Sequence, residues 1–312
     1  MVNVAIAGGS RSIGSAIVAA LHADGSHKCV ILSRTESDDP RVITVDYSDI
    51  RNLAETLDVH EIHTVISALS LQSDASGRAQ MNLIEAAIRS QHTKRFMPSE
   101  FGANYTQKFI KGLPLYAWKL KAADLLEESN LEYTRISNGI FLDYWFAPHI
   151  KSAFAVNVPT WVDVENNYAV IPGDGNAPLV VTHSRDIARF VVAVLGLPRW
   201  EKQYFLVGDR LTINDFVRLA EEVKGVEFEK HTNDAENLAQ GGCTFVPAAR
   251  GLLQALEVED QLSMGRMLAF IGTLIVDGDM DLPAEPNLNK AFPDLKTLTV
   301  REALEISFGK GG

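Results

Sequence analysis

A glycine-rich segment near the start of the chain constrains the fold more than any other feature. The largely apolar run Val2–Ala7 is followed at once by a turn from Gly8 to Gly14, and residues 15–21 have the apolar spacing of a helix. A strand, a turn and a helix start in this order form the context in which a glycine fingerprint indicates a dinucleotide site. Gly8 permits the tight turn, Gly9 gives the backbone room to approach a pyrophosphate, and Gly14 lets the helix lie close to the strand.

The turn predicts a site for the phosphates of a cofactor. Amide groups at a helix start lack partners within the helix and carry the positive end of its dipole, so they favour an anion. The alternative is a purely structural turn in another α/β fold. The residues predicted to bind the cofactor here are Gly8, Gly9, Ser10, Arg11, Ser12, Ile13 and Gly14.

Two arginines favour NADP(H) over NAD(H). The second expected strand, Cys29–Leu32, ends in Ser33 and Arg34, where an NAD site usually carries Asp or Glu about 20 residues past the glycines. A guanidinium binds phosphate through two parallel hydrogen bonds, so Arg34, with Ser33 beside it, suits a 2′-phosphate, and Arg11 adds a second cation. The alternative treats both as solvated surface arginines, and nearby carboxylates such as Glu36 leave NAD(H) open.

Strands and helices alternate through the first half of the chain. Alternation of this kind predicts βαβ units and a parallel sheet with right-handed crossovers. The expected fold is therefore α/β, a doubly wound parallel Rossmann sheet with a smaller, mixed substrate-covering region. Expected strands cover residues 2–7, 29–32, 42–45, 64–69, 95–97 and 133–136, and expected helices cover 15–21, 51–57, 77–89, 115–128, 186–197 and 212–223.

Beyond residue 140 this regular alternation weakens. Residues 161–164 and 168–171 flank a polar turn and predict a hairpin. Residues 204–207 predict a further strand of the main sheet. We therefore expect residues 1–150 to form an NADP-binding Rossmann domain and residues 151–312 a smaller substrate-binding region, with 180–225 returning to the Rossmann sheet.

Composition excludes several classes of protein. The net charge of −11 and the lack of a long Lys/Arg block argue against nucleic-acid binding. No stretch reaches the ~18 apolar residues of a membrane span, and no basic, apolar leader is seen, so a cytoplasmic location is expected. The two cysteines, Cys29 and Cys243, have no metal-ligand spacing. His60 and His63 have no third ligand nearby, so we expect a surface pair and no metal. A small-molecule substrate and a monomer or homodimer are expected.

The string from Arg95 to Tyr105 contains Pro98-Ser-Glu-Phe-Gly102. Taken with the glycine-rich start, this string resembles a known family. It is similar to the atypical short-chain dehydrogenase/reductases of the isoflavone reductase and NmrA-like type. The resemblance covers nearly the whole chain and is weakest over residues 226–290, which should form much of the substrate pocket. Further matches are Lys119, Leu131–Phe141, Gly173-Asp-Gly175, Asp186–Phe190 and Phe292-Pro-Asp294.

The resemblance implies a catalytic lysine. In that family it lies about 14 positions before the tyrosine of a Tyr-Thr pair, and counting back from Tyr133 gives Lys119. Lys121 lies about 200° further round the helix and should face elsewhere. The Tyr-x-x-x-Lys pair of classical short-chain dehydrogenases is absent, and a role for Tyr116, one turn before Lys119, stays open. A lysine desolvated beside a cofactor has a lowered pKa and can exchange a proton as hydride moves. The alternative is a solvated lysine on an amphipathic helix.

Other candidates lie where the expected strands end, because ligands bind at the carboxyl edge of such sheets. Glu100 is either a second carboxylate or a structural acceptor, and Phe141 either a wall of the nicotinamide site or a core residue. Trp118, Trp145 and Trp161 are candidates for an aromatic pocket. The strand-end residues predicted to contact the cofactor are Asp46, Ser67, Ala68, Leu69, Pro98, Ser99, Asn138 and Phe141, together with Lys119.

These features predict an NADPH-dependent reductase of a small, aromatic or heterocyclic metabolite. Hydride would reach a C=C, C=N, C=O or benzylic carbon, with Lys119 as proton donor or base, while the protein controls orientation and the proton. One alternative is a regulator, as among NmrA-like proteins, that binds NAD(P) and a partner protein without turnover. Another is a redox-neutral lyase or isomerase that keeps the nucleotide, since a fold does not settle chemistry.

Overall fold

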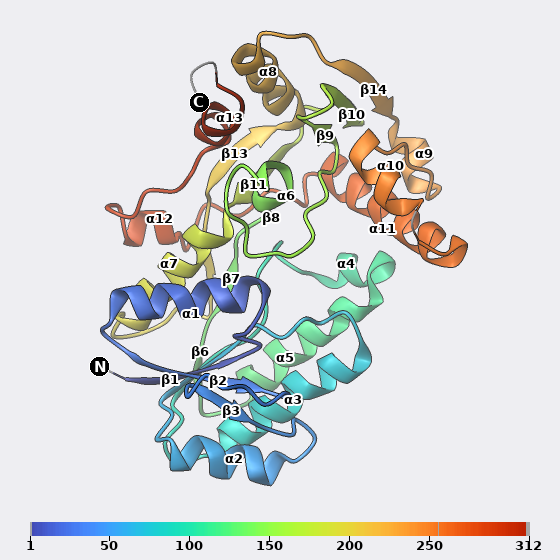
Figure 1. Cartoon of the computed structure of the whole chain (residues 1–312). Helices are drawn as coiled ribbons and strands as arrows, with labels where there is room; N and C mark the ends of the chain where they lie inside the picture. The colour runs from blue at the N-terminus through green and yellow to red at the C-terminus, as the bar shows by residue number, and fades with distance from the viewer. Residues whose placement is uncertain (1, 255, 310–312) are drawn as a thin grey trace.

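A six-stranded parallel sheet forms the base of the structure, a computed structural model that describes residues 2–254 and 256–309 (Figure 1). Its strands run in the order β3-β2-β1-β4-β5-β6, and every neighbouring pair is parallel. The order reverses between β1 and β4, as in a doubly wound sheet, so the predicted fold class is confirmed. The strands are β1 (Asn3–Ala7), β2 (Lys28–Ser33), β3 (Val42–Thr44), β4 (Thr64–Ser67), β5 (Arg95–Met97) and β6 (Glu132–Tyr133).

Helices cover both faces of this sheet. On one face lie α1 (Ser12–Asp24) and α7 (Ser184–Leu195), and on the other α2 (Ile50–Val59), α3 (Asp74–Arg89) and α5 (Ala117–Glu127) (Figure 1). Successive side chains of a strand point to opposite faces. Accordingly Val4 and Ile6 pack in the core cluster with α1 and α7, while Ala5 and Ala7 pack in the cluster with α2, α3 and α5.

The strand predicted over residues 133–136 is divided in the structure. β6 ends at Tyr133, and after Thr134 a separate strand β7 (Arg135–Ser137) pairs in parallel with β12 (Gln203–Phe205). The division follows from Pro98, which ends β5 because it has no amide hydrogen for the ladder. Beyond that point the chain pairs with β12 instead. The prediction that residues 204–207 add a strand to the main sheet is therefore wrong, because β12 and β7 form a separate two-stranded sheet.

The second lobe holds two small mixed sheets and most of the remaining helices. The predicted hairpin is present, because Tyr168 lies opposite Asp163 in an antiparallel pair. The strands of this lobe are β8 (Ile140–Phe141), β9 (Val162–Asp163), β10 (Tyr168–Pro172), β11 (Pro178–Thr182), β13 (Asp209–Thr212) and β14 (Glu229–Asn233). Its helices are α4 (Gln107–Gly112), η1 (Pro114–Tyr116), α6 (Asp143–Phe146), α8 (Ile213–Lys224), α9 (Ala235–Ala239), α10 (Pro247–Leu253), α11 (Val258–Val276) and α13 (Val300–Phe308). The short helix α12 (Leu288–Ala291) instead buries Leu288 in the core cluster of α1 and α7.

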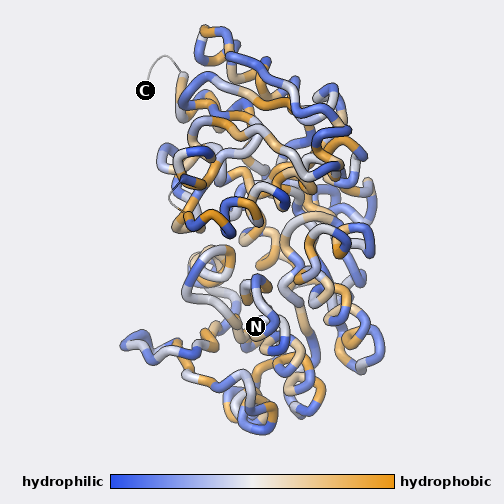
Figure 2. Tube along the Cα trace, turned by 90° about the vertical axis from the view of Figure 1, so that its right-hand side faces the viewer, coloured by the Kyte–Doolittle hydropathy of each residue, from blue (hydrophilic) through white to orange (hydrophobic). Residues whose placement is uncertain are grey.

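The chain passes between the lobes more than once. Within residues 180–225, α7 and β12 lie with the parallel sheet, whereas α8 contributes Ile213 and Phe216 to the core of the second lobe. Seen from the side, apolar segments run through the interior of both lobes (Figure 2). The division at residue 150 stays a proposal.

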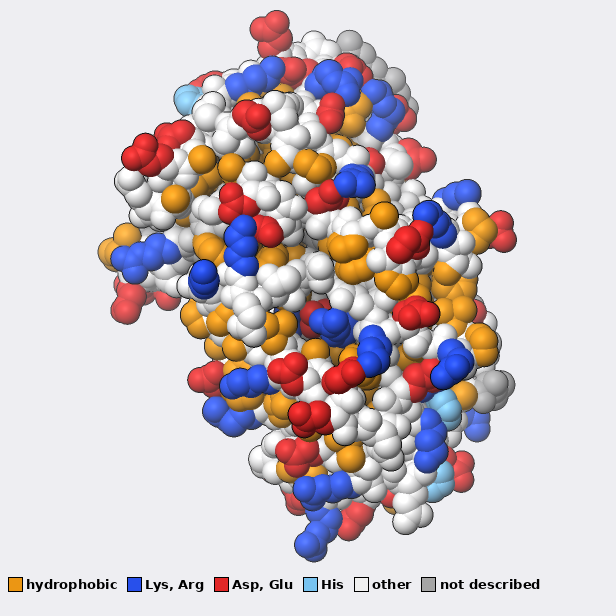
Figure 3. All heavy atoms as spheres, turned by 180° about the vertical axis from the view of Figure 1, so that it is seen from behind, with side chains coloured by type: hydrophobic (Ala, Val, Ile, Leu, Met, Phe, Trp, Pro, Cys, Tyr) orange, Lys and Arg blue, Asp and Glu red, His pale blue; other side chains and the backbone are white. Residues whose placement is uncertain are grey.

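The surface carries charges of both signs. On the face seen from behind, Lys and Arg side chains are interspersed with Asp and Glu side chains (Figure 3). Across residues 2–254 and 256–309, no helix combines the length and the apolar character needed to cross a membrane.

Candidate functional site

A cavity of about 1110 Å³ lies at the carboxyl edge of the parallel sheet and reaches into the second lobe. Its lining begins at the glycine turn after β1 and continues past the ends of β2 and β4. From there it follows the segment after β5 and ends against α10 and α11. Gly8, Ser10, Arg11, Ser12, Ile13, Ser33, Arg34, Ala68, Leu69, Ser99, Lys119 and Phe141 are the predicted site residues that line it. One cavity therefore brings most of the predicted site together.

The glycine turn has almost no room for side chains. Gly8 has a φ of +80°, and a Cβ on it would stand 2.7 Å from the carbonyl oxygen of Ala68. A Cβ on Gly14 would stand 2.3 Å from the carbonyl oxygen of Gly8, so helix α1 packs directly on the turn. Gly9 does not line the cavity, and its missing side chain leaves space for Ile6, Val18 and Ile31 instead.

The start of α1 suits an anion. Arg11 is the N-cap residue with extended backbone, and it makes no side-chain hydrogen bond to the first turn. The amides of that turn are therefore available to a ligand that enters the cavity at Ser12 and Ile13. The uncapped helix start and the crowded glycines fit the pyrophosphate of a dinucleotide.

Two exposed guanidinium groups, Arg11 and Arg34, line the same end of the cavity. The Ser33 hydroxyl accepts from the amide of Thr35 at 3.0 Å and so shapes the turn that carries Arg34. Glu36 also lines this end. Asp46 lies outside the lining, where its carboxylate accepts from the amide of Ser48 at 2.8 Å. Cationic groups thus outnumber carboxylates at this end.

Three further predicted residues are buried behind the cavity. Ser67 is fully buried at the end of β4, and Pro98 is buried at the end of β5. Asn138 is also buried, where its side-chain oxygen accepts from the amide of Gly102 at 2.9 Å and its amide donates to the carbonyl of Gly139 at 3.1 Å. Asn138 thus holds together two loops that line the cavity.

Lys119 lies inside the cavity at the start of α5. Its side chain is buried, and Nζ donates to the carbonyl oxygen of Ser99 at 2.7 Å. The same atom stands 4.5 Å from the centre of the Tyr105 ring and 5.7 Å from that of Tyr116. Burial lowers the pKa of Lys119 to about 8, although the charge of Glu100 opposes that shift. Lys121, as its position on the helix requires, is exposed over the Trp118 ring.

Ser99 fixes the segment to which Lys119 is bonded. Its amide donates to the side chain of Gln80 at 2.9 Å, and its hydroxyl donates to the carbonyl of Leu69 at 2.8 Å. Hydrogen bonds to Gln80 and Leu69 therefore hold Ser99 in place. The hydrogen bond from Lys119 to the Ser99 carbonyl in turn fixes the direction of the ammonium group.

Two of the aromatic rings that line the cavity, Tyr144 and Phe154, were not predicted from the sequence. Phe154 lies edge-to-face 4.7 Å from Phe141, and Tyr144 packs against both. These rings line the cavity together with Tyr105 and Tyr116, the two rings that stand over Lys119. Tyr105 ends the family string, which is a signal that was available, whereas Phe154 lies in an irregular loop that no pattern marks.

The expected tryptophan pocket is wrong. Trp118, Trp145 and Trp161 do not line the cavity. Trp145 and Trp161 are buried in the core of the second lobe, and Trp145 packs edge-to-face on Phe216. Trp118 donates from its indole to Asp74 on α3 at 2.9 Å.

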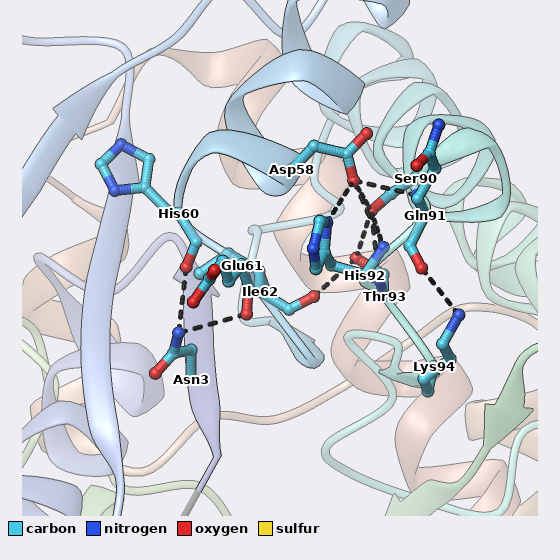
Figure 4. Close-up of polar contacts among 10 residues, drawn as sticks. All are labelled: Asn3, Asp58, His60, Glu61, Ile62, Ser90, Gln91, His92, Thr93 and Lys94. Atoms are coloured by element: carbon cyan, nitrogen blue, oxygen red, sulfur yellow. Dashed lines mark hydrogen bonds and ion pairs between the residues drawn. The ribbon is translucent and has the colours of Figure 1, made fainter.

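The opposite, amino-terminal edge of the sheet carries a structural hydrogen-bond network (Figure 4). Asp58 accepts from the hydroxyl of Ser90 at 2.6 Å and from the amide of Gln91 at 2.9 Å. The carbonyl of His60 accepts from Asn3, and the His60 ring points away from Asp58 in Figure 4. Within the described residues no three His, Cys, Asp or Glu side chains form a group suited to a metal.

Comparison with known proteins places the chain among oxidoreductases. Over 231 residues it is 43% identical to the oxidoreductase BOA1 of Botryotinia fuckeliana, covering 72% of this chain and 77% of that protein. It is 30% identical over 337 residues to the oxidoreductase swnN of Metarhizium robertsii, covering 97% and 96%. The structure of AtPrR2 with NADP+ and (+)pinoresinol superposes with a TM-score of 0.76 over 98% of both chains, at 20% identity.

The profile of the NmrA-like family matches residues 2–298, which is almost the whole length of the chain. This match spans the glycine turn, the Pro98–Gly102 string and Lys119, and it confirms the resemblance found in the sequence. The chain belongs to the NmrA-like family.

Proposed function

We propose that this protein is an NADPH-dependent reductase of a small, uncharged aromatic or heterocyclic metabolite, with Lys119 as the proton donor or base. One observation carries the proposal. The crowded glycine turn and a buried lysine of lowered pKa line the same cavity. Perturbed titratable groups in a cleft are candidates for acid–base chemistry. Two relatives named oxidoreductases support the reaction class.

The choice of NADP(H) rests on charge. Arg11 and Arg34 line the end of the cavity next to β2, where the 2′-phosphate would lie. The related fold of AtPrR2 was determined with NADP+. In this assignment residues 1–150 bind the cofactor, and parts of residues 151–312 cover the substrate.

When bound, NADPH supplies the hydride. The protein supplies the geometry and the proton. Lys119 in its ammonium form donates a proton to the oxygen, nitrogen or carbon of the substrate that becomes electron-rich. In the reverse direction its neutral amine accepts that proton. The carbonyl of Ser99 holds Nζ in place at 2.7 Å.

The chemistry of the lining supports an apolar, ring-bearing substrate. Among the described lining residues, Arg11, Arg34 and Glu36 lie at the cofactor end, and Lys119 is the only other charged one. The Phe141, Tyr144 and Phe154 rings line the same cavity, and such rings favour a planar partner. The far wall is built from aliphatic side chains and methionines: Ala249, Leu252, Leu253, Leu256, Met264, Met267, Leu268, Ile271, Leu274 and Met280.

A kinetic screen tests the proposal. NADPH oxidation should be followed with matched pairs of aromatic enones, imines and ketones, in which one member of each pair carries an added carboxylate. We expect turnover of neutral members and little turnover of their charged partners. Tight NADPH binding without turnover of any compound would instead support a nucleotide-sensing regulator, and a search for its partner protein would follow.

A further inference from the structure

Glu100 is a buried carboxylate that makes no hydrogen bond within the part of the chain that the structure describes. It directly follows Ser99, whose carbonyl holds Lys119, and it is 1% exposed. Neither of its carboxylate oxygens has a hydrogen-bond partner. The nearest cation is the guanidinium of Arg135, whose Nη1 lies 3.8 Å from Oε1.

A carboxylate in such surroundings needs cations to remain charged. Burial raises the pKa of Glu100, and the charges of Lys119 and Arg135 oppose that rise. Arg135 stays protonated under ordinary conditions. It is held from the far side by Gln203, whose Oε1 accepts from Nη2 at 2.8 Å, and Gln203 in turn donates to Asn104 at 2.9 Å. Arg135 is therefore a fixed charge, whereas Lys119 can lose its proton.

We propose that Glu100 is a positioning residue that acts through Lys119, as the counter-charge that keeps this lysine an ammonium ion in an apolar cavity. Glu100 does not line the cavity and does not touch substrate. Its effect is electrostatic: a negative charge in a medium of low dielectric constant stabilises a neighbouring cation more strongly than it would in water.

The other groups that face Lys119 do not carry a compensating charge. Tyr105, from the loop after β5, and Tyr116, from η1, present their rings to Nζ, and burial raises the pKa of both phenols, so they stay neutral. Tyr144, from α6, lines the same cavity and is likewise kept neutral, because burial raises its pKa to about 12. Ser99 presents only a carbonyl dipole. Glu100 thus supplies the negative charge near Lys119. The positive charge of Arg135 partly offsets the effect of that charge on Lys119.

The consequence for the reaction rests on the proposed reductase function. As hydride adds to a substrate carbon, an N–H bond of Lys119 breaks and its proton goes to the electron-rich substrate atom. This leaves a neutral amine, which regains a proton from solvent. Glu100 stays ionised throughout and transfers no proton. Without its charge, a larger share of Lys119 would be neutral amine before the step begins.

The test follows the titration of Lys119 itself. Isotope-labelled lysine side chains are observed by NMR over a range of pH in the free protein, and Lys119→Ala identifies the resonance. Glu100→Gln keeps the shape and removes the charge, and we expect it to lower the titration midpoint by about one pH unit or more. Glu128→Gln, which alters an exposed carboxylate at the end of the same helix, should leave the midpoint unchanged.

Glu100→Asp separates charge from packing. It retains the carboxylate on a shorter side chain, so its midpoint should lie closer to wild type than that of Glu100→Gln. Circular dichroism and NADPH titration verify that each variant is folded. An unchanged midpoint in Glu100→Gln, or equal shifts in the Gln and Asp variants, overturns the inference. Because this measurement needs no substrate, it stands even if no reductase activity is found.

Discussion

The α-carbon of Gly14 lies so close to Gly8 that an added Cβ would stand 2.3 Å from the Gly8 carbonyl oxygen. Both the oxygen and its carbonyl carbon belong to the backbone, so neither can rotate away as a side chain would. The lack of a Cβ on Gly14 therefore allows α1 to pack this closely on the turn that follows β1.

Replacing Gly14 by valine should abolish cofactor binding. The branched side chain pushes α1 from the turn and displaces the amides that would meet the pyrophosphate, and overpacking of this kind costs about 1–3 kcal/mol of stability. NADPH titration by fluorescence and circular dichroism measure the two effects. Gly196→Val is the control, because a Cβ there would meet only the Ala193 carbonyl oxygen, at 3.4 Å. Normal NADPH binding by the Gly14 variant would place the nucleotide site elsewhere.

Replacing Arg34 by alanine should weaken NADPH far more than NADH. A charge-assisted contact to the 2′-phosphate contributes about 1.5–3 kcal/mol, and NADH lacks that phosphate. Dissociation constants for both cofactors with both proteins give the difference. Arg41→Ala is a matched control, since that guanidinium is paired with Asp39 at 2.7 Å. Equal losses for the two cofactors would remove the assignment of Arg34.

Replacing Lys119 by alanine should reduce turnover by about 10²–10⁴-fold, the usual range for loss of a general acid or base. NADPH affinity should fall less, because the glycine turn and the two arginines remain. Lys121→Ala serves as the control and should be close to wild type, since that side chain is exposed. Unchanged turnover in the Lys119 variant would eliminate the proposed role.

The rate of reduction should fall as pH rises through about 8, the pKa of Lys119. Burial places this value below the 10.5 of a free lysine, so the ammonium form is lost earlier than in an exposed lysine. Oxidation, which needs the neutral amine, should rise over the same interval. The reduction rate at saturating NADPH and the oxidation rate at saturating NADP+, each measured across this pH range, test both expectations. A reduction rate that stays level to the titration range of free lysine contradicts the assignment.

Replacing Phe154 by alanine should raise KM for a ring-bearing substrate and leave NADPH affinity unchanged. The Phe154 ring lines the cavity, and an aromatic contact between it and a substrate ring would contribute about 0.5–1.5 kcal/mol. The expected change in KM is therefore about 2–12-fold. An equal loss of NADPH affinity would indicate that Phe154 holds up the cofactor site instead.

The sequence predicts the parallel sheet and the glycine turn well, because these depend on local patterns. Periodicity marks the strands of the parallel sheet and the helices that cover it, and the crowding at Gly8 and Gly14 follows from the fingerprint. Lys119 needed the family spacing as well, since its helix alone resembles any amphipathic surface helix.

Other features depend on contacts between distant residues and could not be predicted. The break between β6 and β7 requires knowing that β12 is available as a partner for Arg135–Ser137. Phe154 reaches Phe141 only through the path of an irregular loop. Trp145 and Trp161 are buried in the core of the second lobe. The sequence identifies Glu100 as a carboxylate within the family string. That neither of its oxygens has a hydrogen-bond partner depends on the elements packed around it.

The passage of α7 and β12 back to the parallel sheet means that the two lobes are not interchangeable modules. A fragment that ends at residue 150 would leave Ile13 and Ile17 of α1 exposed, because Ile187 and Val191 of α7 belong to the same core cluster. Exchange of the part proposed to cover the substrate with that of a relative must therefore retain residues 184–205 of the original chain. Variation in substrate range should be easiest to engineer in α10 and α11. These helices come later in the chain and can change without disturbing the packing of α7 on the parallel sheet.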